Sequence, residues 1–377
     1  MTSPAPAAPD HSPTLVTLGL GARIGAAMPY LLVPLLMIAG FLAIWLQDSW
    51  PALTILRGPD GGFESFEIVL SPIDARLSSW VTLTVSGLAM GMMIFLMASG
   101  LTLVFGLMDV INFGHGAFIS IGAFVGVTVL ALYPEMSTSP DLGTNLLVIG
   151  GAALAAMLAT GGLGLAFERI IVRPVYGHHL KQILVTMGGL IIAEQLIAVV
   201  WGPEEIFLTR PESLKGVITF EGAALETYRL LAVIVGLAVF VLMRLVLRHT
   251  KIGLIIRAGV QNGEMVRAMG YRLRQVFVWT FIIGSALAGL GGVMWGLYQE
   301  VVTAQMGAHM MVMVFIVVII GGLGSVEGCF IGALMVGLLQ NYVAFLEPKL
   351  ALVSTIGLMV LILMWRPEGM MPAVRAR

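Results

Sequence analysis

The sequence has few charged residues and a single cysteine. Only 11% of its 377 residues are charged and its mean hydropathy is +0.98, whereas about a quarter of the residues of a soluble domain are charged. This composition excludes an ordinary soluble domain and indicates an integral membrane protein. The single cysteine, Cys329, excludes an intramolecular disulfide and a zinc site built from thiolates.

The sequence also lacks the motifs by which a membrane protein could power or catalyse a reaction alone. The dipeptide Gly-Lys does not occur, so there is no G-x-x-x-x-G-K-[ST] phosphate loop and the chain is not its own ATPase of that kind. No H-E-x-x-H, G-x-S-x-G or T-V-G-Y-G motif occurs. A net charge of −1 without a basic, aromatic face argues against nucleic-acid binding. We therefore expect neither an enzyme nor a potassium channel.

Long apolar runs fill most of the chain. A helix needs about 20 mostly apolar residues to cross the hydrocarbon core. We therefore expect an all-α integral membrane protein with about ten transmembrane helices, some of them broken or re-entrant. The predicted spans are 29–46, 79–107, 117–133, 145–168, 182–201, 228–247, 275–298, 310–323, 330–346 and 350–365.

We divide the chain into four parts. Residues 1–28 are rich in proline and small residues and are expected to form a disordered cytoplasmic tail. Residues 29–77 are expected to form an extra N-terminal transmembrane anchor with an acidic outer segment. Residues 78–369 form the main membrane domain, and 370–377 a second cytoplasmic tail.

The basic residues gather in one loop. Short loops rich in Lys and Arg stay in the cytoplasm, and an inside N-terminus places all such loops there and the acidic loops outside. A large basic loop at 249–274, in a chain without an energy-converting motif, predicts the place where an external motor acts. The basic residues in and beside it are Arg244, Arg248, Lys251, Arg257, Arg267, Arg272 and Arg274.

Two glycine-rich stretches interrupt the apolar runs, at 112–116 and 321–324. Both predict helix breaks or re-entrant turns, which are tolerated at membrane depth only where protein buries them or they line a watery cavity. They therefore mark a translocation pathway. The stretch Gly116-Ala-Phe-Ile is echoed by Gly328-Cys-Phe-Ile, either as the trace of a duplicated half or as a coincidence.

Several polar residues within the apolar regions have two interpretations each. A polar group without a partner in a dry environment costs roughly 2 to 7 kcal/mol, so Asn112 and His115 either line a gate or lock a helix break. Glu194 either lines the pathway or makes a buried hydrogen bond between helices. His309 is expected at an outer interface, and Glu327 at an inner boundary, where a structural or motor-facing role is favoured. The candidate pathway or gate residues are Asn112, Gly114, His115, Gly116, Glu194, Gly321, Gly322, Gly324 and Glu327.

The basic loop also carries a specific pattern. From Arg257 to Gly270 it reads Arg-Ala-Gly-Val-Gln-Asn-Gly-Glu-Met-Val-Arg-Ala-Met-Gly. It resembles the loop R-A-x-x-x-[DN]-x-E-x-x-R-x-x-G of the permease subunits of branched-chain amino acid ABC importers. Gly263 and Met265 stand where that family usually has Pro and Ala, which leaves the start of its short coupling helix open. The matching residues are Arg257, Ala258, Asn262, Glu264, Arg267 and Gly270.

Two further stretches agree with the same family in the expected order. The run from Gly100 to Gly116 is similar to G-L-x-L-x-x-G-x-x-x-x-x-N-x-x-H-G, and an Asn before the His is typical of the H-type permeases (LivH). The stretches 321–328 and 366–369 complete the pattern. The resemblance covers roughly residues 79 to 369.

This resemblance implies a permease subunit in a bacterial inner membrane, forming half of the pathway for branched-chain or other aliphatic amino acids. The implied partners are a homologous M-type permease, two cytoplasmic ATPase subunits and a periplasmic or extracellular solute-binding protein. ATP and Mg²⁺ would bind the ATPases, and this chain would hold no cofactor or metal. The helix within 257–270 would receive the force of ATPase closure; the alternative is a solvated loop with an internal pair between Glu264 and Arg267.

Two other functions remain open at this point. The first is a related importer for urea, short amides or small carboxylates. The second is a stand-alone secondary carrier. The sequence decides neither the solute nor whether the permease pair is a heterodimer or a homodimer.

Overall fold

A computed structural model describes residues 20–48, 52–57, 63–69, 73–220, 222–261 and 263–371. Nine helices in this part are long and apolar enough to cross a membrane, and α11 has 16 residues. These ten helices coincide with the ten predicted spans, which confirms the all-α membrane class. The ten are α1 (Leu20–Asp48), α2 (Ile73–Met108), α3 (His115–Leu132), α5 (Leu142–Phe167), α6 (His179–Trp201), α7 (Thr227–His249), α10 (Leu273–Gln299), α11 (Met306–Gly321), α12 (Val326–Leu346) and α13 (Ala351–Trp365).

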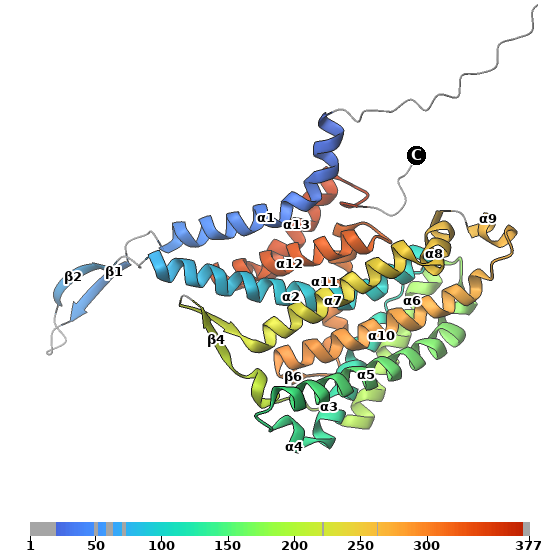
Figure 1. The fold of residues 1–377 in the computed structure, drawn as a ribbon, viewed down its shortest axis with the longest axis horizontal. Coiled ribbons are helices and arrows are strands. Elements are labelled where there is room, and N and C mark those ends of the chain that lie inside the picture. The colour runs from blue at the N-terminus through green and yellow to red at the C-terminus, as the bar shows by residue number, and fades with distance from the viewer. Residues whose placement is uncertain are drawn as a thin grey trace, which may run out of the picture.

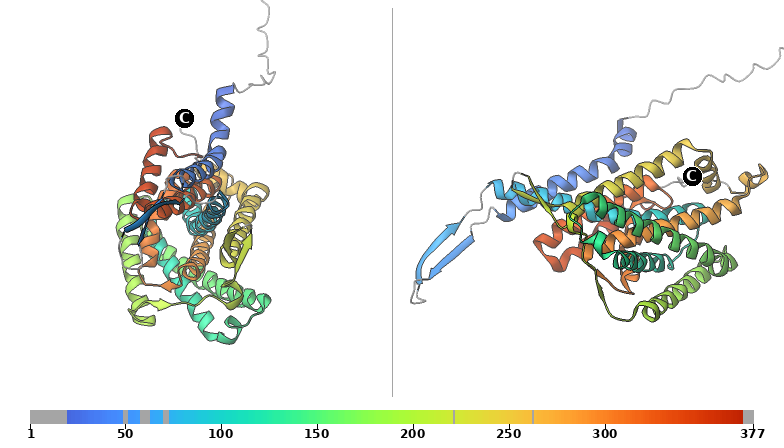
Figure 2. Two further views of the ribbon diagram at one scale, coloured as in Figure 1. Left: turned by 90° about the vertical axis from the view of Figure 1, so that its left-hand side faces the viewer. Right: turned by 60° about the horizontal axis from the view of Figure 1, so that its bottom comes forward.

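Short elements cover the two ends of the helix bundle (Figures 1 and 2). We call the end that carries α8 and α9 the inner end and the end that carries the sheets β3–β6 and β4–β5 the outer end, following the predicted topology. The short helices are α4 (Pro134–Ser137), α8 (Lys251–Gln261), α9 (Gly263–Ala268) and a π-helical turn (Glu168–Val172). The strands form three antiparallel pairs: β1 (Ala52–Arg57) with β2 (Phe63–Val69), β3 (Ile206–Phe207) with β6 (Val301–Val302), and β4 (Val217–Phe220) with β5 (Ala223–Glu226).

The chain between α2 and α3 re-enters the membrane from the inner end. It leaves α2 at Asp109, whose φ is 51°. The ring nitrogen Nε2 of His115, the first residue of α3, lies 2.9 Å from the carbonyl oxygen of Met97. Because Met97 lies about three helical turns, or roughly 16 Å, before the end of α2, α3 begins deep in the membrane. The predicted break at 112–116 is therefore a re-entrant segment.

A second segment re-enters from the outer end, between α10 and α11. After β6 the chain descends along α3, where the hydroxyl of Ser120 donates to the carbonyl oxygen of Ala304 and accepts from the N–H of Gly307, both at 2.8 Å. The first turns of α3 and α11 thus cross inside the membrane. The sequence interpretation did not predict this break. His309, which it placed at an outer edge, lies in the first turn of α11.

The two re-entrant segments belong to two halves with the same packing. Helix α2 packs on α12 as α10 packs on α5, α3 packs on α5 as α11 packs on α12, and α3 packs on α6 as α11 packs on α13. Since the halves run in opposite directions, this is an inverted-topology repeat, an arrangement common among transporters. The sequence echo of Gly116 and Gly328 falls on α3 and α12, which are not counterparts, so it does not reflect this repeat.

Glycines permit the two central crossings. A Cβ atom at Gly307 would overlap the carbonyl oxygen of Gly116, and one at Gly100 of α2 would overlap that of Gly284 of α10. Small residues at such positions let helix backbones approach closely, which is how helices associate in a bilayer that provides no hydrophobic drive between them.

An ion-pair network fixes the outer loop to the end of α10. Arg210 lies 2.9 Å from a carboxylate oxygen of Glu226 and 2.9 Å from one of Glu300. It also donates hydrogen bonds to the carbonyl oxygens of Leu297 and Tyr298 in the last turn of α10. One arginine therefore satisfies carbonyl groups that a helix end leaves without partners.

The ends of the chain differ from the predicted divisions. Helix α1 begins at Leu20, inside the predicted tail 1–28, and residues 1–19 lie outside the described residues. At the other end, the N–H groups of Met370 and Met371 donate to the carbonyl oxygens of Ile320 and Gly321. The first two residues of the predicted tail 370–377 are therefore held against α11.

We predict that Gly307→Ala destabilises the protein, because the new methyl group overlaps backbone that cannot move without separating α3 from α11. Overpacking of this kind costs about 1–3 kcal/mol. The thermal unfolding midpoint of the purified chain should fall by several degrees. Gly150→Ala on α5 is the matched control, since its Cβ would meet nothing within 4 Å. Equal midpoints for the two variants would contradict the crossing.

Candidate functional site

The re-entrant segment and the start of α3 are held by a backbone carbonyl of α2 and by side chains of α5 and α6. His115 is buried, and its Nε2 donates to the Met97 carbonyl oxygen, so this nitrogen carries the hydrogen. The N–H of Phe113 donates to the hydroxyl of Thr186 at 3.1 Å, and Gly114 lies against the ring of Phe167, where a Cβ would not fit. This geometry supports the interpretation of His115 as a lock on the helix break.

Asn112, in the same segment, lacks the hydrogen-bond partner that His115 has. Its side chain is completely buried, and neither the amide oxygen nor the amide nitrogen has a hydrogen-bond partner among the described residues. A buried polar group without a partner costs about 1–3 kcal/mol. The two residues that the sequence grouped together are therefore distinct: the imidazole of His115 has a hydrogen-bond partner in the protein, and the amide of Asn112 has none among the described residues.

Two ionisable residues lie on the exposed face of α6 and α11 at membrane depth. Glu194 of α6 is half-buried, and one of its carboxylate oxygens has no partner among the described residues. Its charge interacts with His309, which is exposed on the first turn of α11. Ionisable side chains inside a membrane almost always face a partner helix or a watery cavity, so this face is not an ordinary lipid-facing surface.

The glycines from 321 to 328 form a tight turn at the inner end. Gly321 and Gly328 touch backbone to backbone, and Gly324 packs against Gly106 of α2. Gly322 and Gly324 have φ values of 95° and 77°, which favour glycine. The predicted second break is thus the hairpin between α11 and α12 and does not lie at mid-membrane depth.

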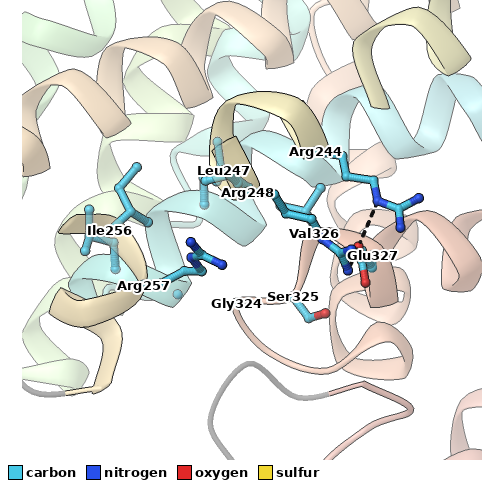
Figure 3. A pocket seen from close by; sticks show the side chains of 12 residues that line it. Arg244, Leu247, Arg248, Ile256, Arg257, Gly324, Ser325, Val326 and Glu327 are labelled. Carbon is cyan, nitrogen blue, oxygen red and sulfur yellow. Dashed lines mark ion pairs between the residues drawn. The ribbon is translucent and has the colours of Figure 1, made fainter. Parts of the chain in front are cut away.

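Glu327, in the first turn of α12, ties this hairpin to the end of α7. Its carboxylate oxygen Oε1 lies 3.2 Å from Nε of Arg244 and 2.5 Å from Nη2 of Arg248 (Figure 3). A pocket of about 270 Å³ opens beside these three residues, and Arg257 of α8 also lines it. We call this group of four residues the inner clamp. The sequence placed Glu327 near an inner boundary, where the structure finds it, but did not identify its partners.

The basic loop holds two helices, and the shorter of them, α9, lies within the predicted range 257–270. Its role as a coupling helix stays a prediction. Helix α8 packs on α2 where Gly259 meets Leu107, and α9 is anchored by buried Val266. Arg257 and Arg267 are exposed, Ala258 is partly buried, and Gly270 ends the segment with a φ of 86°.

The predicted pair of Glu264 and Arg267 stays untested. The structure does not describe the side chain of Glu264, and Asn262 lies outside the described residues altogether. Four apolar side chains of this loop are exposed: Ile252, Leu254, Met265 and Met269.

No metal centre is found in the described part of the chain, where no three His, Cys, Asp or Glu residues gather in a way that could hold a metal ion.

Comparison with known proteins places these features in a family. Residues 83–364 match the family described as "Branched-chain amino acid transport system / permease component". The chain belongs to this permease family. The match runs from α2 into α13, so α1 and the β1–β2 hairpin precede the part that the family shares.

Individual relatives agree with the H-type assignment. The high-affinity branched-chain amino acid transport permease BraD of Pseudomonas aeruginosa is 27% identical over 76% of this chain and 94% of its own length. LivH of Escherichia coli K12 is 25% identical over 76% of this chain and 93% of its own. The M-type permease LivM of the same strain is 26% identical, with 71% of its own length covered. This permease thus spans almost the whole of the H-type relatives.

We predict opposite effects on stability for two substitutions in the re-entrant segment. Asn112→Leu removes a polar group that lacks partners, so the thermal unfolding midpoint of the purified permease should stay the same or rise. His115→Leu removes the hydrogen bond to Met97 and should lower it by several degrees. If Asn112→Leu were the more destabilising variant, Asn112 would be part of the lock.

Proposed function

We propose that this permease is the H-type subunit of an ATP-driven importer in a bacterial inner membrane, and that it forms half of the pathway for branched-chain or other aliphatic amino acids. Its partners would be an M-type permease, two ATPase subunits that bind ATP and Mg²⁺, and a solute-binding protein outside the membrane. The observation that carries the proposal is the inner clamp, in which Arg244 and Arg248, at the end of α7 that leads into the basic loop, hold Glu327 of the α11–α12 hairpin.

The inner face supports docking of an ATPase. Its exposed side chains include the apolar Ile252, Leu254, Met265 and Met269 and the cations Lys251, Arg257 and Arg267. Protein interfaces typically combine apolar side chains with charged ones at the rim. Covering the exposed methionines with a partner protein would remove apolar surface from water, which is favourable.

The inner clamp offers a route for force. A push on α8 moves the end of α7, to which α8 is joined, and Arg244 and Arg248 there hold Glu327 of α12. The tight Gly321–Gly328 contact passes the motion to α11. The other end of α11 carries His309 and crosses α3. Closure of the ATPases would therefore move the parts of α11 and α3 that lie in the middle of the membrane.

The pathway would lie on the face of α6 and α11. Half-buried Glu194 and exposed His309 lie there at membrane depth, and a homologous permease covering this face would enclose them in a shared cavity. This arrangement accounts for two subunits forming one path. Branched-chain amino acids are proposed as the solute because the names of BraD and LivH state it for those proteins.

We predict that Gly270→Trp leaves membrane insertion intact but uncouples ATP hydrolysis from uptake. The bulky side chain would stand at the end of α9, on the docking face, and should lower ATP-driven leucine uptake by the importer in proteoliposomes by about tenfold or more, with residual ATP hydrolysis that solute no longer stimulates.

Gly202→Trp is the matched control. Like Gly270, Gly202 has a positive φ and no neighbour within 4 Å of an added Cβ, but it follows α6 at the outer end. Its ATP hydrolysis should remain stimulated by solute. Normal coupled uptake by Gly270→Trp would contradict the assignment of the docking face. Uptake of urea or short amides in place of leucine would contradict the proposed solute.

A further inference from the structure

A second, larger pocket lies at the inner end, between the last turns of α5 and the first turns of α10. Its volume is about 820 Å³. It is separate from the inner clamp, with which it shares no residue, and of the residues that line it the proposed ATPase docking uses only Arg267. Five arginines from three segments line it: Arg169, Arg173, Arg267, Arg272 and Arg274.

The charges in this pocket are not balanced. None of the five guanidinium groups forms an ion pair with a carboxylate of the described residues. The one acidic residue that lines the pocket, Glu168, is buried, and one of its oxygens accepts a hydrogen bond from the Tyr176 hydroxyl at 2.8 Å. Like charges held this close repel one another, so the pocket favours an anionic ligand.

The part of the pocket nearer the membrane centre is apolar. Leu165 of α5 and Val278 and Ile282 of α10 form its wall, beside Trp279, whose side chain is 64% exposed. Trp279 lies nearly two turns, roughly 9 Å, into α10 from its start. A tryptophan at this depth is typical of the interface between headgroups and acyl chains.

We propose that this pocket binds an anionic phospholipid, with its phosphate among the arginines and one acyl chain along Trp279 and Ile282. Arginine is suited to this role because its planar fork donates two parallel hydrogen bonds to a phosphate. A headgroup at the charged end and a chain at the apolar end match the two halves of the pocket, whereas a free phosphate would leave the apolar half unused. The proposal requires only that the chain spans a membrane, and it holds whatever solute the permease moves.

A bound lipid would connect three segments. Arg169 and Arg173 follow α5, Arg272 and Arg274 begin α10, and Arg267 belongs to α9 in the basic loop. The phosphate would bring these cations together, so it would hold α9 in place relative to the bundle. Anionic lipid should therefore stabilise the permease as well as bind to it.

The test uses the full chain, purified in mild detergent and stripped of lipid. Phosphatidylglycerol, phosphatidylcholine and inorganic phosphate are added separately, and binding is followed by native mass spectrometry and by the thermal unfolding midpoint. Two double variants remove the charges, Arg169→Gln with Arg173→Gln and Arg272→Gln with Arg274→Gln. The matched control, Lys181→Gln with Lys251→Gln, removes two exposed cations of the inner end outside the pocket.

We expect phosphatidylglycerol to bind and to raise the unfolding midpoint, with weaker binding at high salt. Each arginine near an anionic headgroup contributes about 1 kcal/mol, so each double variant should weaken apparent affinity by roughly tenfold or more, and the lysine control should not.

Three results would overturn the proposal. The first is equal binding of phosphatidylcholine, which would point to non-specific lipid adsorption. The second is equal stabilisation by inorganic phosphate alone, which would make this a free-anion site. The third is unchanged phosphatidylglycerol binding in both arginine double variants, whether or not they lose affinity for a partner protein.

Discussion

The crossing of two helix starts inside the membrane is the constraint on which the rest of the structure depends. A bilayer offers no water to unpaired backbone groups, so irregular chain at this depth must be satisfied by protein. The Ser120 hydroxyl donates a hydrogen bond to the Ala304 carbonyl oxygen and accepts one from the Gly307 N–H. The Thr186 hydroxyl accepts one from the Phe113 N–H. Glycines at 116 and 307 let the two backbones approach closely. The short length of α11 and the packing of α3 between α5 and α10 follow from this crossing.

The inverted repeat is complete at the centre of the molecule and broken at its inner end. Helices α2 and α10 occupy equivalent places, but only the second half is preceded by α7, α8 and α9, a long helix followed by a basic pair of short helices. The inner clamp connects this addition to α12. Because this addition is present in only one half of the repeat, force applied to the basic loop would be transmitted toward α11.

Hydropathy predicted the spans well because it depends on residues next to one another in the chain. It did not reveal the re-entry before α11, because Val301 and Val302 look like the edge of an outer loop until β6 pairs with β3. The glycines from 321 were identified as a break, but their depth depends on how α11 and α12 pack. The division of the basic loop into α8, which ends at Gln261, and α9, which begins at Gly263, was not predicted from the sequence.

The sites that sequence reasoning missed are those that bring distant residues together. Glu327 was named without its partners Arg244 and Arg248, and the arginine pocket combines α5, α9 and α10. His115 and Asn112 were singled out because polar groups are rare in such runs, but only the structure shows that His115 has a hydrogen-bond partner and that Asn112 has none among the described residues. Membership in the permease family was predictable because three spaced motifs carry it.

The central claim is that energy from the inner face reaches the middle of the membrane through α7, α12 and α11. It is tested most directly by the reactivity of a cysteine at position 309, in a background where buried Cys329 is replaced by serine. The assembled importer in proteoliposomes would be labelled from outside with a membrane-impermeant thiol reagent, nucleotide-free and with its ATPases trapped in the closed state. The account predicts that the labelling rate changes by about tenfold or more between the two states. An identical rate in both states would contradict it.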